Sequence, residues 1–300
     1  MNKESVKGYL FVIVSAVIFG LSPIAAKVVY ANGGTPIIVL LFRSASFPLL
    51  FMMAKGQRCS MKLTVTEGRK ILILGLLGAT ITPLCTLNAY VLIPSGTATT
   101  IHYMYCVFIL LECVLFYHDK LDIKKAICIA LCMLGVFLLY APDEAGNLLG
   151  LTLALISAIT YATYSVYLEK SGMHAMNVFK IQFYMNLVSF ICISTYTAIS
   201  GQFAFSIAPA GWIIMIAYYS FGMVSASMLF QLGVHYIGSQ RAAILSTFEP
   251  LTSVILGILV FGDLLNIRII MGISIILMSA IIITTTRGAV SKKQAKHDDA

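Results

Sequence analysis

Long stretches of apolar residues occupy most of the chain, and short polar segments rich in Gly and Pro separate them. A helix needs about 20 mostly apolar residues to cross the hydrocarbon core of a bilayer. Backbone groups in lipid must be hydrogen-bonded within their own element, and the stretches lack the alternating polarity of membrane β-strands. The pattern therefore predicts ten transmembrane α-helices, at residues 9–30, 36–54, 71–92, 96–116, 124–140, 148–168, 177–199, 211–232, 239–261 and 267–286.

The composition supports a membrane protein and excludes most soluble classes. Apolar residues make up 59% of the 300 residues and charged residues 11%, whereas soluble domains have about 45–50% and about 25%. The first apolar stretch, Tyr9 to Tyr30, is too long for the apolar core of a signal peptide. We therefore expect it to be an uncleaved first span.

The positive charges favour one orientation in the membrane. With the N-terminus in the cytoplasm, seventeen of the 20 Lys and Arg residues fall in inner loops, as the positive-inside rule requires. Arg268 lies in an outer loop, while Lys27 and Arg43 lie within spans. We expect a plasma-membrane protein with both termini in the cytoplasm. The basic residues are spread over many short loops, which argues against a nucleic-acid partner.

The two halves of the chain contain five predicted spans each. Because five is odd, the second half enters the membrane from the opposite side, and inverted repeats of this kind are common among transporters. Asp119 and Asp263 follow the fourth and ninth spans at the same offset, and Ser157 in the sixth span parallels Ser15 in the first. The expected division is a first repeat at 1–140, an outer linker at 141–147, a second repeat at 148–286 and a polar cytoplasmic tail at 287–300.

The ninth span carries the sharpest motif. It reads SQRAAILSTFEPL from Ser239 to Leu251, and Phe261-Gly262-Asp263 closes it. This stretch resembles the EamA-like branch of the drug/metabolite transporter superfamily, whose members usually close the motif with Gly-Glu. The resemblance extends over nearly the whole chain, although the fourth span differs from many members. It implies a ten-span secondary transporter or exporter with a central cavity.

Four ionisable residues within spans are candidates for coupling or for ion pairs, because charges inside a bilayer are costly: Glu249, Arg43, Lys27 and Glu112. Glu249 lies about 15 Å into the ninth span at 1.5 Å per residue, near the midplane. It could carry a proton, bind a cationic group, or pair with Lys27 or Arg43. Arg43 could hold a carboxylate through its planar fork or form a structural ion pair. Lys27 is close enough to the outer end of its span to reach the interface.

The fourth span carries polar groups on one face. His102, Tyr105 and Glu112 lie at i, i+3 and i+10, which places them along one side of a helix. They could line a cavity, with His102 or Glu112 titrating during transport. The alternatives are a hydrogen bond from His102 to another helix and a Glu112 that reaches the inner interface. Polar and aromatic residues on other spans complete the candidate substrate-binding set: Asn88, Tyr161, Tyr164, Tyr218 and Ser225.

These candidates predict a secondary transporter or exporter of a small organic metabolite, an amino acid or related compound, that works by alternating access around a midplane cavity. The alternative is efflux of a drug or organic cation. The two differ in cavity charge: an unpaired Glu249 favours cations, and Arg43 facing the same cavity favours a zwitterion or anion.

Other classes of protein lack their signatures. The sequence has no GxxxxGK[ST] motif, so we expect an ion or solute gradient, with protons as the candidate ion, as the energy source. HExxH and GxGD are also absent, which argues against an intramembrane enzyme. Cys128 and Cys132 share a helix face without a His or acid, which favours packing over a metal site. We expect no cofactor or metal, a small-molecule substrate and the lipid bilayer as partners, and a chain compatible with a homodimer.

Overall fold

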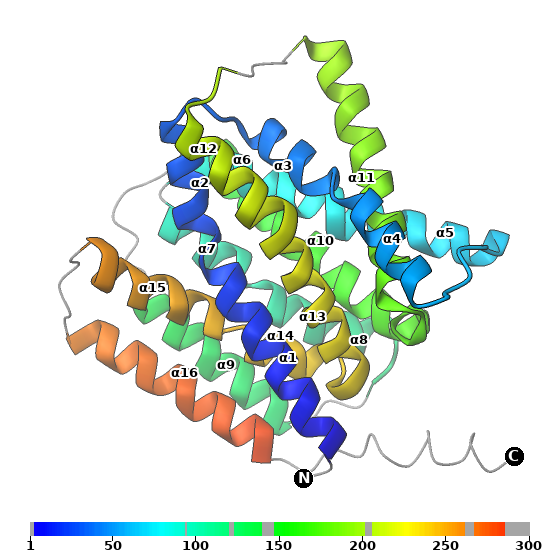
Figure 1. Ribbon diagram of the computed structural model, residues 1–300. Coiled ribbons are helices and arrows are strands. Elements are labelled where there is room, and N and C mark those ends of the chain that lie inside the picture. Colours follow the sequence, from blue (N-terminus) through cyan, green and yellow to red (C-terminus); the bar gives the residue numbers. More distant parts are fainter. Residues whose placement is uncertain are drawn as a thin grey trace, which may run out of the picture.

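The computed structural model describes residues 3–93, 95–119, 123–139, 147–201, 206–261 and 267–285. Within these ranges every regular element is a helix, and Figure 1 shows the helices packed side by side. Shorter apolar helices lie at Tyr105–Leu115 and Ile270–Ser279. An all-helical membrane protein is confirmed. Six helical segments of the described chain are long and apolar enough to cross a membrane: Glu4–Ala31, Pro36–Gly56, Val65–Leu92, Leu148–Lys170, Val178–Ser200 and Pro209–Ile237.

Each predicted span corresponds to one or more helices. The first half contains α1 (Lys3–Gly20), α2 (Ser22–Ala31), α3 (Pro36–Ser44), α4 (Phe47–Gly56), α5 (Val65–Leu74), η1 (Gly75–Ile81), α6 (Thr82–Leu92), α7 (Ser95–His102), α8 (Tyr105–Leu115) and α9 (Ile123–Leu139). The second half contains α10 (Leu148–Lys170), η2 (Met173–Ala175), α11 (Val178–Ser200), α12 (Pro209–Ile214), η3 (Met215–Gly222), α13 (Met223–Ile237), α14 (Ser239–Leu245), α15 (Phe248–Phe261) and α16 (Ile267–Thr285).

The structure corrects the prediction of continuous spans. The predicted spans at 9–30, 36–54, 96–116 and 239–261 are each divided into two helices. Those at 71–92 and 211–232 pass through π-helical segments, η1 and η3. Hydrophobic patterning detects apolar length but not such interruptions, because a broken helix can be as apolar as a straight one.

Proline accounts for two of these irregularities, because it lacks the N–H that would bond the carbonyl four residues earlier. Pro83 follows η1 and leaves the Ala79 carbonyl without that donor; the Ser189 hydroxyl of α11 donates to it instead, at 2.9 Å. Pro250 likewise has no N–H for the Ser246 carbonyl, which accepts from the Glu249 N–H at 2.9 Å and from the Tyr103 hydroxyl at 3.3 Å. Side chains from other helices thus contribute hydrogen bonds at both breaks.

Polar side chains fix several helix starts. Thr64 and Glu67 form a reciprocal capping box at the start of α5. Asn147 and Asn177 cap α10 and α11 by accepting from backbone N–H groups within the first turn. Gly201 ends α11 with φ +66°, in the left-handed region that glycine adopts without strain.

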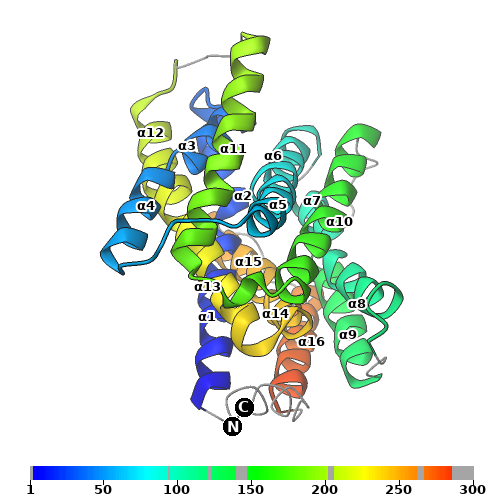
Figure 2. The ribbon, with the colours of Figure 1, turned by 90° about the vertical axis from the view of Figure 1, so that its right-hand side faces the viewer.

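Helices from the two halves pack closely against each other. α1 runs along α13, α9 along α16, and α10 along α6 and α8 (Figures 1 and 2). Small residues permit this approach, as is common between membrane helices. A Cβ on Gly233 would overlap Val12 of α1, and one on Gly135 would lie 2.6 Å from Ile276 of α16. The two halves therefore form one interlocked bundle.

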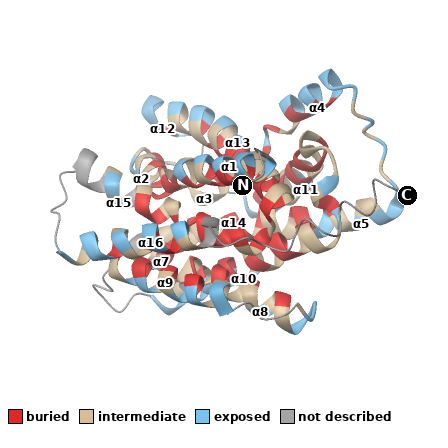
Figure 3. Cartoon of the chain, turned by 90° about the horizontal axis from the view of Figure 1, so that it is seen from below, coloured by how far each residue is buried: buried red, intermediate tan, exposed pale blue. Residues whose placement is uncertain are grey.

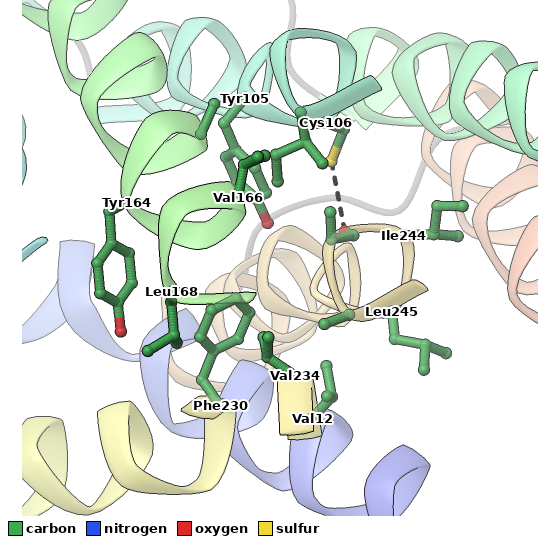
Figure 4. Close-up of a cluster of buried hydrophobic side chains, with 14 of the residues drawn as sticks. Val12, Tyr105, Cys106, Tyr164, Val166, Leu168, Phe230, Val234, Ile244 and Leu245 are labelled. Atoms are coloured by element: carbon green, nitrogen blue, oxygen red, sulfur yellow. Dashed lines mark hydrogen bonds between the residues drawn. The ribbon is translucent and has the colours of Figure 1, made fainter. Parts of the chain in front are cut away.

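Buried side chains lie at the centre of the bundle and exposed ones on its outer faces (Figure 3). The largest buried cluster joins α8, α10, α13 and α14, and includes Tyr105, Phe230 and Leu245 (Figure 4). In that cluster the Cys106 thiol donates to the Ala243 carbonyl at 3.3 Å. Many large apolar side chains, such as Met52, are instead exposed on the outside. That distribution fits a bundle whose outer surface meets lipid.

Candidate functional site

A cavity of about 90 Å³ lies inside the bundle, between helices of both halves. A water-sized group needs roughly 10–15 Å³ of such volume, so the cavity has room for about six to nine of them. Its polar lining includes Arg43 from α3, His102 from α7, Gln182 from α11 and Glu249 from α15. The prediction of a central cavity is thereby given a definite location.

Two opposite charges line this cavity, Arg43 and Glu249. Arg43 donates from Nη2 to the Ser227 hydroxyl at 3.3 Å. Within the described residues the only ion pair is Lys170–Asp119, at 2.6 Å. Glu249 thus forms no ion pair with Arg43 or Lys27 in this part of the chain.

An aromatic cluster lies beside the two charges. The ring centroid of Tyr161 lies 4.7 Å from that of Tyr105, 5.5 Å from that of His102 and 5.6 Å from that of Phe230. Figure 4 shows Tyr105, Tyr164 and Phe230 on three different helices. Tyr161 and Tyr164, both predicted as substrate-binding, line the cavity together with these charges.

His102 lines the cavity and also bonds another helix. Its Nδ1 lies 2.8 Å from the Ser157 hydroxyl of α10. Ser157 donates its own proton to the Ala154 carbonyl at 2.6 Å. The hydroxyl must then accept from His102, which assigns the proton of the neutral ring to Nδ1 and leaves Nε2 as an acceptor. The predicted hydrogen bond between helices is therefore present, and it fixes the tautomer of a cavity residue.

The structure does not bring the other predicted residues to the cavity lining. Tyr105 is buried within the aromatic cluster. Asn88 bonds the Leu84 carbonyl of its own helix. The remaining four are placed as follows: the Tyr218 hydroxyl donates to the Ile18 carbonyl at 2.8 Å, Glu112 accepts from Thr163 at 2.8 Å, and Ser225 and Lys27 are exposed.

Several lining residues were not predicted from the sequence, notably Gln182, Asn186, Tyr219 and Ser227. Gln182 and Asn186 lie at i and i+4 of α11, a polar stripe that helical spacing could have revealed. Ser227 and Tyr219 replace the predicted Ser225 and Tyr218. This helix contains the π segment η3, across which the spacing of an ordinary α-helix does not hold.

Five of the seven cysteines are buried within the bundle. Cys128 and Cys132 are fully buried, and the Cys132 thiol lies 3.1 Å from the Ser279 hydroxyl of α16. Across the part of the chain that is described, no group of three or more His, Cys, Asp or Glu side chains is placed to hold a metal ion.

The class of this protein follows from a family comparison. The sequence model of the EamA-like transporter family matches residues 6–141 and 148–285, once in each half. The chain therefore belongs to the EamA-like transporter family, and the resemblance seen in the ninth span is confirmed.

Named relatives give the same class at low identity. An uncharacterized transporter of Synechocystis is 27% identical over 59% of this chain and 55% of its own length. One from Archaeoglobus fulgidus is 25% identical over 55% of this chain and 58% of its own length. A second uncharacterized transporter from that organism is 22% identical over 84% of this chain and 90% of its own length. The chain thus matches little more than half the length of the first two relatives.

A solved crystal structure shares the fold. It superposes with a TM-score of 0.76 at 14% sequence identity, over 92% of this chain and 97% of that one. At this low sequence identity, the superposition shows that the two proteins share a fold and nothing beyond it.

Proposed function

We propose that this protein is a secondary transporter of a small zwitterionic metabolite, an amino acid or related compound. The observation that carries the proposal is that Arg43 and Glu249 line one cavity without forming an ion pair with each other in the described structure. A buried charge without a counter-charge is costly. A solute with a carboxylate and an ammonium group would supply both counter-charges at once. The guanidinium fork of Arg43 suits the carboxylate, and Glu249 suits the ammonium group.

The size of the cavity supports the same class of solute. Room for about six to nine water-sized groups corresponds to a small amino acid rather than a multi-ring drug. Tyr161, Tyr164 and Phe230 form apolar walls beside the charges. A few polar groups set in a mostly apolar cavity is the usual plan of a small-molecule site.

Alternating access would follow from two inverted repeats, at residues 1–140 and 148–286. The packing supports this symmetry: α1 on α13 has its counterpart in α10 on α6, and α1 on α15 in α10 on α8. The third and eighth predicted spans both contain a π segment. Rocking of one repeat against the other would expose the cavity to each side in turn. Both termini then lie in the cytoplasm, with Glu249 as the candidate proton carrier.

Efflux of an organic cation is the second candidate. The aromatic cluster around Tyr161 and the carboxylate of Glu249 would attract a cation. Arg43 in the same cavity opposes it, because a like charge in a low-dielectric site is repelled. The zwitterion therefore fits the whole lining better than a cation does.

Transport by reconstituted protein tests the proposal. We expect counterflow of labelled small amino acids in proteoliposomes, and a loss of at least tenfold in Glu249→Gln with normal insertion. Ser225→Ala, on the exposed side of α13, is the matched control and should keep wild-type rates. Counterflow of organic cations without any of amino acids would contradict the proposal. Unchanged transport with unchanged pH dependence in Glu249→Gln would exclude Glu249 from binding and proton coupling.

A further inference from the structure

A group of neutral polar side chains lies on one side of the cavity. Tyr164 of α10 and Gln182 and Asn186 of α11 line it, and Gln231 of α13 contacts Tyr164. All four are at most 4% exposed. Tyr164, Gln182 and Gln231 lie within about two turns of the helix ends that the proposed topology places in the cytoplasm. We call these four residues the amide cluster.

The hydrogen bonds within the amide cluster leave two of its buried atoms without a partner. Gln231 donates from Nε2 to the Tyr164 hydroxyl at 3.0 Å. Asn186 donates from Nδ2 to Gln182 Oε1 at 3.0 Å. Gln182 Nε2 and Gln231 Oε1 are buried and have no partner in the described structure. Buried amide groups nearly always have partners, so these two atoms point to a ligand group.

We propose that the amide cluster is a second subsite of the cavity, which binds the side chain of the transported solute. The group bound there accepts a hydrogen bond from Gln182 Nε2 and donates one to Gln231 Oε1. This inference rests on the proposed function, since the same solute brings its charged groups to Arg43 and Glu249. The substrate class becomes small amino acids with a hydroxyl or carboxamide side chain.

The chemistry of the two unused atoms excludes other side chains. A carboxylate has no proton for Gln231 Oε1, and an ammonium group cannot accept from Gln182 Nε2. An apolar side chain of the same size leaves both atoms unpaired, and a site built to hydrogen-bond a hydroxyl strongly rejects the analogue that lacks it. Met185, whose sulfur lies 3.4 Å from Gln231 Nε2, provides apolar contact beside the polar pair. The subsite thus distinguishes solutes of equal size by hydrogen bonding.

Calorimetric binding by the purified full-length protein tests the subsite with two nearly isosteric pairs, threonine against valine and asparagine against leucine. We expect threonine and asparagine to bind at least tenfold more tightly than their partners. Gln182→Met, which keeps the side-chain length, should bring the threonine-to-valine ratio to about one. Asn88→Leu removes an amide outside the cavity lining, and it should keep the wild-type ratio.

The outcomes separate this inference from the proposed function. Equal binding of threonine and valine to the wild-type protein would overturn the amide subsite, because water alone would then satisfy the cluster, and would leave zwitterion binding in place. The wild-type comparison decides this even if Gln182→Met does not fold. Failure of all four amino acids to bind, with binding of an organic cation such as tetraethylammonium, would overturn both.

Discussion

At the scale of single residues, the proposed recognition of a carboxylate depends most on the geometry of the Arg43 guanidinium. It lies in the cavity and contacts the Ser227 hydroxyl at 3.3 Å. A guanidinium can hold a carboxylate by two parallel hydrogen bonds, whereas a lysine ammonium acts as a point charge. A lysine at this position would therefore keep the positive charge but lose the proposed paired hydrogen bonds to the carboxylate.

Arg43→Lys should weaken amino-acid binding about tenfold, equivalent to about 1.4 kcal/mol. The methyl ester of the same amino acid lacks the carboxylate, so we expect it to bind the wild-type protein more weakly than the acid does. Its affinity should change little in Arg43→Lys. Competition against a labelled amino acid measures both. Equal losses for the acid and its ester would show that Arg43 does not contact the carboxylate.

The sequence could identify some cavity residues and not others, for physical reasons. Arg43, Glu249 and His102 were recognisable because an ionisable group inside a bilayer is rare and costly. Gln182 and Ser227 are neutral, and neutral polar residues also pack membrane helices without any ligand. Lys27 shows the opposite case: it lies within an apolar stretch but reaches the exposed surface. A charged residue within a span is therefore a candidate cavity residue. Its role depends on how deep it lies in the membrane and on whether its side chain faces the cavity or the surface.

At the scale of elements, the break at Pro83 depends on a hydrogen bond from a different helix. Ser189 of α11 donates to the Ala79 carbonyl that proline leaves unbonded. The lost backbone hydrogen bond at Pro83 follows from the sequence alone, because proline has no N–H. It could not predict Ser189 as the partner, since spacing along one helix says nothing about which helix lies opposite. The same limit concealed Tyr103 at the Ser246 carbonyl.

Ser189→Ala should destabilise the protein by about 1–3 kcal/mol, because it leaves a buried carbonyl unbonded. In a Pro83→Ala background the new N–H can bond Ala79, so the cost of Ser189→Ala should fall by about 1 kcal/mol. Unfolding in mixed micelles measures this double-mutant cycle. Ser274→Ala, an exposed serine that bonds its own helix, should be nearly neutral. Strictly additive losses would contradict the compensating role of Ser189.

At the scale of the whole molecule, charge bias and symmetric packing support the same inverted arrangement. The distribution of Lys and Arg predicted ten spans and their direction, while the pairing of α1 with α13 and of α10 with α6 came from the structure. Patterning could not supply these pairings, because all the spans are similarly apolar. Where the cavity lies follows from the pairing, so the sequence predicted that a cavity exists but not its full lining.

Labelling with a membrane-impermeant maleimide tests this orientation. Cys59 lies in a segment predicted to face the cytoplasm, while most other cysteines are buried. It should react only in opened or inverted vesicles, and Cys59→Ser is the control for that signal. Ser200→Cys, at the exposed end of α11, should react in intact cells. The reverse pattern would overturn the proposed topology.

In the proposed function, Arg43 and Glu249 bind the two charges of one zwitterion. Thermal stabilisation of the purified protein by threonine, its methyl ester and its N-acetyl derivative tests this most directly, because a ligand that binds the folded state raises its stability by mass action. We predict the largest shift with threonine. In Arg43→Gln, threonine should no longer stabilise the protein more than its methyl ester does. In Glu249→Gln, threonine should no longer stabilise it more than the N-acetyl derivative does. Stabilisation by lipophilic cations and by none of these three compounds would contradict the claim and identify a cation exporter.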